Sequence, residues 1–190
     1  MNVAFAADGR LVHVFSDAVF SGAAIRYDET SVPDPITPSG AAKAATKTAV
    51  DAIVSNSAVV QTSLIVGDGD SPHEVLVHRL AGGGVRGTLF TDDVRCPVHV
   101  ADFAAALLER ATSRYHGVHH VAGADAVSRY ELGLLIARRD GLDMDEVPSG
   151  RRAEAGLTGP LDVRLRCDMT QRRLRTELRG ARQFLGEGHR

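Results

Sequence analysis

Hydrophobic and polar positions in the first third of the chain alternate between a strand pattern and a helix pattern. Residues 10–15 form a short apolar run rich in β-forming side chains, and the run ends at Ser16-Asp17, which predicts a buried strand. A loop over 18–38 contains three prolines and precedes residues 40–54, whose alanine content and apolar spacing predict a helix. Residues 57–66 read as a second buried strand. This order of strand, helix and strand predicts an α/β fold with a parallel sheet.

Shorter elements are predicted for the rest of the chain. The pattern predicts helices over 72–80, 100–111, 128–139 and 170–178, and short strands over 87–90 and 118–121. Ser128 begins its helix as the N-cap, and Glu131 three residues later completes a capping box. No internal repeat and no low-complexity linker separates these elements.

The composition is that of a globular protein with a hydrophobic core. Of the 190 residues, 44% are hydrophobic and 24% are charged, which excludes a disordered chain and a disulfide-stapled miniprotein. No apolar run approaches the roughly 20 residues that span a bilayer, and the first residues lack the pattern of a signal peptide. Cys96 and Cys167 lie far apart and form no CxxC pair, which is typical of reduced thiols in a cytoplasmic protein. The net charge of −2 and the 5% aromatic content predict neither a nucleic-acid partner nor a membrane partner.

Three motifs look functional but favour structural interpretations. The GxGxxG at Gly82–Gly87 follows a predicted helix and precedes a predicted strand. A dinucleotide site needs a strand before the motif and a helix after it, so we interpret the motif as a flexible helix-to-strand connection. The histidines at 116, 119 and 120 divide between two faces of a strand and have no obvious third ligand, so we expect no metal site. The C-terminal arginines are interleaved with acidic residues, which is typical of a solvated face.

The residues best placed for chemistry lie near the start of the chain. Ser16 and Asp17 end a predicted parallel strand, where α/β folds bind their ligands. Ser39 and Lys43 stand four residues apart and therefore share one face of the following helix. Short-chain dehydrogenases place a serine, a tyrosine and a lysine in this arrangement, the tyrosine as the proton donor and the lysine lowering its pKa.

Several further motifs in the same order resemble the dTDP-4-dehydrorhamnose reductase family. They are Val12–Gly22, Tyr27–Glu29, Pro33–Pro35, Ser39–Lys43, Gln61–Ser63, Asp92–Pro97, Asp102–Ala104, Ser128–Leu132 and Pro160–Leu165. The family reduces 4-keto nucleotide sugars with NAD(P). The resemblance implies a partial Rossmann-like parallel sheet over 1–66, a remnant of the NAD(P)-binding domain. It implies a small sugar-nucleotide-binding α/β region over 67–190, interleaved with the last sheet strand.

The resemblance also assigns roles to individual residues. Ser16 would polarise the keto group, Lys43 would contact the nicotinamide ribose, and Ser39 occupies the position of the family's tyrosine. The implied substrate-binding residues are Asp17, Phe20, Gln61, Thr62 and Ser63.

The sequence departs from the family in two respects that affect activity. It has no glycine-rich strand–turn–helix for the cofactor pyrophosphate, so we expect the chain alone not to bind NAD(P). Ser39 is a far weaker acid than tyrosine, so we expect little or no reductase activity from the chain alone. Ala18, Gln61 and Lys47 also replace residues that are common in the family.

Two functions therefore remain open at the sequence level. The chain is either a truncated reductase-like protein or a non-catalytic sugar-nucleotide-binding or regulatory module, as in the related subunit of methionine adenosyltransferase. Without the glycine-rich half, the sheet would have an unpaired edge, which a partner chain or a homodimer would cover.

Overall fold

A parallel three-stranded sheet in the order β1-β3-β8 organises the computed structural model, which describes residues 10–54 and 56–186. The strands are β1 (Leu11–Ser16), β3 (Ser57–Thr62) and β8 (Gly117–His120). Phe15 pairs with Gln61, which pairs with His120 on its other side. The strand predicted over 10–15, the strand near 118–121 and the α/β class are confirmed.

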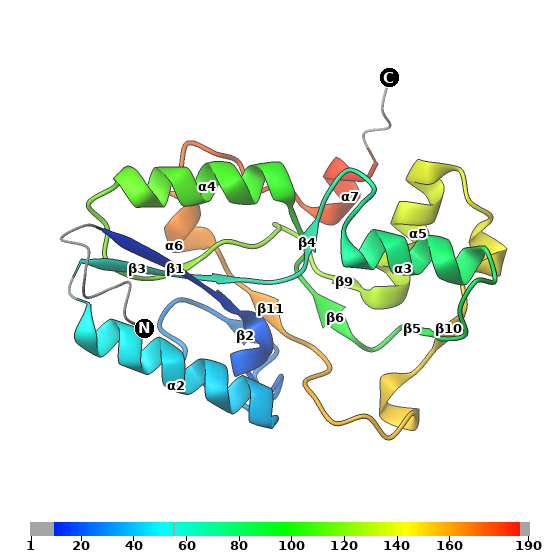
Figure 1. Cartoon of the computed structure of the whole chain (residues 1–190), viewed down its shortest axis with the longest axis horizontal. Helices are drawn as coiled ribbons and strands as arrows, with labels where there is room; N and C mark the ends of the chain where they lie inside the picture. The colour runs from blue at the N-terminus through cyan, green and yellow to red at the C-terminus, as the bar shows by residue number, and fades with distance from the viewer. Residues whose placement is uncertain (1–9, 55, 187–190) are drawn as a thin grey trace.

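Helices cover both faces of this sheet (Figure 1). Helix α2 (Pro38–Ile53) lies against one face, where Phe15, Val50 and Val59 form a buried cluster. Helix α4 (Val100–Thr112) lies against the other face, where Phe103 and Ala106 pack on Val60. Both helices confirm the sequence predictions. Because α2 and α4 bury the two faces, the sheet is a sandwiched layer, as is typical of parallel sheets.

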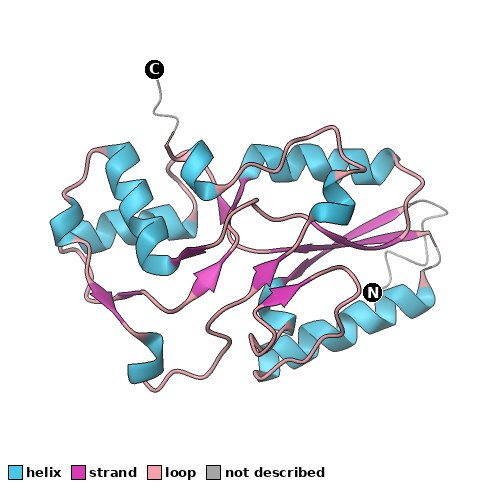
Figure 2. Cartoon of the chain, turned by 180° about the vertical axis from the view of Figure 1, so that it is seen from behind, coloured by secondary structure: helices cyan, strands magenta, loops and turns pink. Residues whose placement is uncertain are grey.

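The second half of the molecule, at the other end of the long axis, consists of short strands and the two longer helices α3 (Pro72–Ala81) and α5 (Arg129–Asp140) (Figures 1 and 2). Helices α3 and α5 pack together through a cluster that includes Val77, Leu132 and Ile136. The remaining helices are η1 (Asp17–Val19), η2 (Met144–Glu146), η3 (Arg152–Glu154), α6 (Asp168–Gln171) and α7 (Ala181–Phe184).

Four pairs of two-residue strands complete the described fold. β2 (Arg26–Tyr27) pairs with β11 (Arg164–Leu165), β4 (Ile65–Val66) with β7 (Val98–His99), β5 (Leu89–Phe90) with β10 (Ser149–Gly150), and β6 (Val94–Arg95) with β9 (Val127–Ser128). Only β6 and β9 are antiparallel. The domain boundary expected at residue 66 stays a prediction.

The prediction of one strand over 57–66 was wrong, since β3 ends at Thr62 and β4 begins at Ile65. Ser63 lies between them, and its hydroxyl bonds to Asp17 and to the Cys96 backbone instead of continuing the ladder. The helix predicted over 170–178 was also wrong beyond residue 171. There the carboxylate of Glu109 accepts the backbone N–H groups of Arg175 and Thr176, which holds the chain in an irregular conformation.

The Gly82–Gly87 motif is a helix-to-strand connection, as expected. Gly82 caps the end of α3, and β5 begins at Leu89. Among the described residues, no group of three or more histidine, cysteine or acidic side chains is arranged to hold a metal ion. No helix in the described part of the chain combines the length and the apolarity needed to cross a membrane.

Candidate functional site

The carboxyl end of β1 borders a cavity of about 490 Å³, which we call the serine–lysine cavity. Its lining residues are His13, Val14, Phe15, Ser16, Ser39, Ala42, Lys43, Thr46 and Thr62. All three residues expected to be catalytic (Ser16, Ser39 and Lys43) therefore face one space. The volume lies in the range of small-molecule sites.

The start of α2 brings Ser39 and Lys43 to this cavity. The Thr37 hydroxyl accepts the Gly40 backbone N–H at 3.0 Å as the N-cap, and Pro38 occupies the first helical turn. A Cβ atom at Gly40 would overlap the Ala18 carbonyl oxygen, so glycine allows α2 to approach the end of β1. One turn of helix then places the Lys43 ammonium 3.2 Å from the Ser39 hydroxyl, to which it donates.

The Ser16 hydroxyl forms hydrogen bonds with the two residues that follow it in the chain. Its Oγ accepts the Ala18 backbone N–H at 3.2 Å and donates to Asp17 Oδ1 at 3.2 Å. The other Asp17 oxygen accepts the Ser63 hydroxyl at 2.7 Å. Burial raises the pKa of Asp17 above its ordinary value, although Arg95 and the Ser63 hydroxyl act in the opposite direction.

A second cavity, of about 430 Å³, lies between α3, α5 and β5, and we call it the arginine cavity. Its lining residues are His73, Leu76, Val77, Thr88, Leu89, Phe90, Asp93, Arg129, Leu132, Gly133, Ile136, Arg152 and Leu157. Its walls are mostly apolar, and its polar groups are the Arg129 and Arg152 guanidinium groups, the His73 imidazole, the Asp93 carboxylate and the Thr88 hydroxyl. Apolar walls with two arginines suit a ligand that has an aromatic part and an anionic part.

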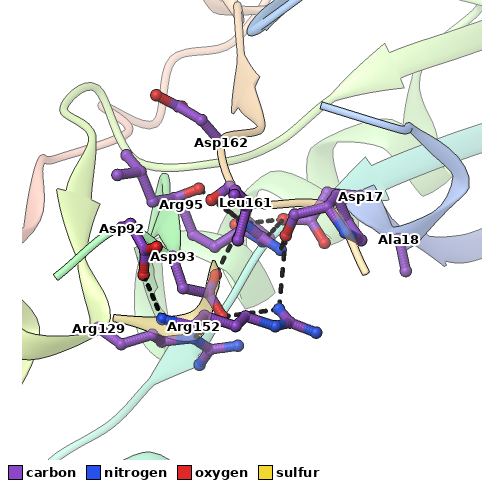
Figure 3. A network of polar contacts seen from close by, with 12 residues as sticks. Asp17, Ala18, Asp92, Asp93, Arg95, Arg129, Arg152, Leu161 and Asp162 are labelled. Atoms are coloured by element: carbon purple, nitrogen blue, oxygen red, sulfur yellow. Dashed lines mark hydrogen bonds and ion pairs between the residues drawn. The ribbon is translucent and has the colours of Figure 1, made fainter. Parts of the chain in front are cut away.

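A chain of ion pairs connects the two cavities (Figure 3). Arg95 lies 3.6 Å from Asp17 and 2.9 Å from Asp93. Asp93 also lies 3.0 Å from Arg152 and 3.7 Å from Arg129. The side chains of Asp17, Asp93 and Arg95 are each less than one-tenth exposed, so water screens these contacts only weakly.

Two further groups complete the rim of the arginine cavity. Asp92 accepts the backbone N–H groups of Arg152 at 2.6 Å and of Ala153 at 3.1 Å, and thereby fixes the start of η3. Arg129 donates to His73 Nδ1 at 3.1 Å. Burial, followed by the nearby Arg129 charge, lowers the pKa of His73 to about 4, so His73 is neutral near pH 7.

The predicted substrate-binding residues fall into two groups. Thr62 lines the serine–lysine cavity and donates to the Val121 carbonyl at 2.7 Å, while Asp17 and Ser63 lie directly behind Ser16. Phe20 and Gln61, by contrast, have no exposed surface and line neither cavity. The Phe20 ring stacks on Tyr27 at a centroid distance of 4.1 Å.

Sequence reasoning did not identify the arginine cavity. Its polar residues come from distant segments, and neither Arg129 nor Arg152 was assigned a role from the sequence. The useful signal was the Asp92-Asp93 pair, because two adjacent carboxylates near a buried strand require cationic partners.

Comparisons with known proteins agree with this geometry. The chain is 34% identical over 145 residues to the dTDP-4-dehydrorhamnose reductase of Mycobacterium tuberculosis, which covers 73% of this chain and 48% of that protein. It is 26% identical over 136 residues to the methionine adenosyltransferase 2 subunit beta of Xenopus laevis, covering 67% of this chain and 41% of that protein. The chain thus spans about half the length, or less, of these curated relatives.

Solved structures of dTDP-4-dehydrorhamnose reductases share the fold. The protein from Clostridium acetobutylicum superposes with a TM-score of 0.85 at 22% identity, over 97% of this chain and 66% of that one. The protein from Bacillus anthracis, a complex with NADP, gives a TM-score of 0.82 at 22% identity, over 94% and 64%. The family model described as the RmlD substrate binding domain matches residues 1–187. The chain therefore belongs to the family of RmlD substrate binding domains, within the dTDP-4-dehydrorhamnose reductase group.

Proposed function

We propose that the chain holds a nucleotide sugar across the two cavities, as the substrate-binding part of a reductase of 4-keto nucleotide sugars. The observation that carries the proposal is the pairing of an apolar cavity containing two arginines with a cavity containing Ser16 and Lys43, joined through Asp93 and Arg95. The base would lie on the apolar walls of the arginine cavity. The diphosphate would pair with Arg129 and Arg152.

The sugar end of this ligand would lie in the serine–lysine cavity. There the Ser16 hydroxyl is the group that would polarise a keto oxygen. Thr62 lines the same wall, and Asp17 and Ser63 support Ser16 from behind.

The residues present fit only one end of NAD(P). Lys43 and Ser39 would contact the nicotinamide ribose, since both face the serine–lysine cavity. A dinucleotide pyrophosphate binds where a glycine-rich turn leads from a strand into a helix N-terminus. The glycine-containing turn between β4 and α3 does not offer this site, because the Glu74 carboxylate accepts its Gly67, Gly69 and Ser71 backbone N–H groups. We therefore derive no hydride step for this chain. We expect it to bind NAD(P) poorly and to turn over slowly or not at all by itself.

Proton delivery is the second deficit. A general acid contributes a factor of about 10²–10⁴, and the aliphatic hydroxyl of Ser39 is a poor acid at neutral pH. The nearest phenol, Tyr27, is buried and accepts the backbone N–H groups of Gly22 and Ala24. It therefore does not face the serine–lysine cavity.

Titration calorimetry with dTDP-glucose tests the binding proposal. We expect Arg152→Met and Arg129→Met each to weaken binding by about tenfold or more, because each removes a charge-assisted contact. Arg151→Met is the matched control, since Arg151 is exposed, does not line the arginine cavity and forms an ion pair with Glu154 in the same turn. Circular dichroism verifies that each variant folds. If dTDP-glucose shows no binding at millimolar concentration, or if Arg151→Met weakens it equally, the proposal is wrong.

A regulatory or partner-binding module is the second candidate, favoured by the free edge of the sheet. Within the described residues β1 pairs only with β3, and Val14 on this edge is 42% exposed. A strand from a second copy or from a partner chain would pair with this edge. Light scattering coupled to size exclusion tests this candidate: a monomer at all concentrations argues against self-pairing, and a Val14→Lys variant should dissociate a dimer.

A further inference from the structure

The hydroxyl of Ser16 is directed away from the substrate that the proposed function gives it. A hydroxyl group has one hydrogen, and Ser16 donates it to Asp17 Oδ1. The Ala18 backbone N–H fills one acceptor position of the same oxygen. In this arrangement Ser16 has no hydrogen left for a keto oxygen. It gains one only if Asp17 becomes the donor, which requires a proton on the Asp17 carboxyl.

The charges around Asp17 decide whether it carries that proton. Three arginines (Arg95, Arg129 and Arg152) face the two buried carboxylates of Asp17 and Asp93. The Asp92 carboxylate, which bonds to the Arg152 backbone, brings the net charge of the cluster to zero. Backbone carbonyls of Val94, Pro160 and Leu161 hold the Arg95 guanidinium at 2.7–3.1 Å. The cluster is therefore rigid, and it responds to an added charge by changing protonation more readily than by moving.

A bound diphosphate diester would bring two negative charges to Arg129 and Arg152. The net charge of the cluster would change from zero to two negative, and one proton would remove half of that charge. Asp17 is the group in the cluster that combines deep burial with a weak, 3.6 Å contact to its arginine. Asp93, by contrast, is shared by three arginines.

We propose that binding of an anionic nucleotide sugar in the arginine cavity drives proton uptake by Asp17, which turns the Ser16 hydroxyl into the serine–lysine cavity. The proton comes from solvent and binds Asp17 Oδ1. Asp17 then donates to Ser16 Oγ, and the Ser16 O–H points towards the sugar. Asp17, Arg95 and Asp93 are positioning residues in this scheme. The inference rests on the proposed function and adds to it a coupling between the two ends of the ligand.

Other titratable groups face this cluster and must be separated from Asp17. Asp92 on the β5–β6 connection stays ionised, because the backbone N–H groups of Arg152 and Ala153 outweigh burial and lower its pKa. His73 on α3 has a pKa of about 4 and would gain a proton more easily beside an anion. Burial raises the pKa of the Cys96 thiol to about 11, so it remains neutral. His73 is therefore the one competitor that needs its own variant.

The experiment measures the dissociation constant of dTDP-glucose between pH 5 and pH 8, a range in which the diphosphate diester itself does not titrate. We expect affinity to fall as pH rises, by up to tenfold per pH unit where one proton is taken up. Asp17→Asn should remove this dependence, because an asparagine amide donates to Ser16 at every pH. His73→Gln should retain it. Asp162→Asn is the matched control, since Asp162 pairs with Arg164 and contacts none of the three arginines of the cluster.

A second measurement follows the Asp17 carboxyl directly by ¹³C NMR, with its resonance assigned through the backbone resonances of the unsubstituted protein. We expect saturation with dTDP-glucose to raise the titration midpoint by about one pH unit or more, as two charges at roughly 10 Å would do in a partly buried site. Asp17→Asn that fails to fold leaves this carboxyl titration as the test. Binding with a pH-independent affinity and an unmoved Asp17 resonance overturns the inference and leaves the proposed function intact. Absence of binding overturns both.

Discussion

Glu74 is a buried carboxylate whose removal should destabilise the wall of the arginine cavity. It has no exposed surface, and its oxygens accept the backbone N–H groups of Gly67, Gly69 and Ser71 at 3.0–3.1 Å. Arg139 donates to it at 2.7 Å. The Ser71 hydroxyl accepts the Glu74 backbone N–H in return, which makes a capping box at the start of α3.

The size of the effect follows from which donors lose their partner. After Glu74→Ala, solvent can reach the exposed Gly69 backbone, but Gly67 and the Arg139 guanidinium are buried. The buried Gly67 N–H loses a bond to a charged group, which costs about 1.5–3 kcal/mol, whereas the Arg139 guanidinium keeps Asp140 and the Gly67 carbonyl as partners. We therefore expect a loss of roughly 2–4 kcal/mol, since no buried charge is left without a partner. Glu74→Gln retains one carbonyl oxygen and should lose about half as much.

The pH dependence has a definite sign. Burial acts to raise the pKa of Glu74, but the hydrogen bonds from Ser71 and Arg139 outweigh it and lower the pKa overall. A carboxyl with a lowered folded-state pKa stabilises the fold above its unfolded value of about 4.3, and this stabilisation is lost as pH falls through the folded value. The difference in unfolding free energy between wild type and Glu74→Gln should therefore shrink below about pH 4.

Urea denaturation followed by circular dichroism at pH 7 and at pH 3.5 measures both effects. Glu146→Gln is the matched control, because Glu146 is exposed in η2, and its substitution should change stability by no more than about 0.5 kcal/mol. If Glu74→Gln is as stable as wild type at pH 7, the carboxylate does not hold the turn before α3. If the difference between the two proteins grows at pH 3.5, the sign of the argument is wrong.

Three further predictions concern reactivity, packing and repair. Burial raises the pKa of Cys96 to about 11 and of Cys167 to about 12. Neither thiol should therefore react measurably with iodoacetamide at pH 8 in the native state, and rapid alkylation would contradict this. A Cβ atom at Gly133 would overlap the Leu89 side chain, so Gly133→Ala should lower the unfolding free energy by about 1–3 kcal/mol, and an unchanged urea midpoint would exclude the overlap. Ser39→Tyr alone should produce no NADPH consumption with a 4-keto nucleotide sugar. One side chain does not restore the positioning of the cofactor, which is worth on the order of 7–11 kcal/mol of the activation barrier. Clear turnover would show that the chain binds the cofactor.

The strongly periodic parts of the chain were predictable because the signal for each element lies within its own segment of sequence. The apolar run before Ser16 and the alanine-rich helix after Pro38 each carry their signal within a few residues. Their relative placement also followed from the sequence, because a strand end and the next helix start meet in this topology. Ser16, Ser39 and Lys43 accordingly line one cavity.

The parts that could not be predicted depend on contacts between distant segments. Thr170 to Leu178 has a helical pattern, but the Glu109 carboxylate captures its backbone N–H groups across 66 residues or more. Phe20 follows the Ser16-Asp17 motif closely and was expected to bind substrate, yet its ring is buried against Tyr27. The arginine cavity arises where α3, α5 and η3 meet, which no single window of sequence contains.

The pairing of β2 with β11 has a consequence for how the protein folds during synthesis. Arg26 lies beside Arg164, and the Glu29 carboxylate accepts the backbone N–H and the hydroxyl of Thr170 across 141 residues of chain. The loop after β1 therefore cannot reach its final conformation until residues 164–170 have left the ribosome. Pairings this distant are slow to form, because the entropy of closing the loop is lost before the contact is gained. Until then Phe20 and Tyr27 lack Val163 and Leu165, which complete their buried cluster, so a nascent chain halted before residue 163 would leave this aromatic pair incompletely covered.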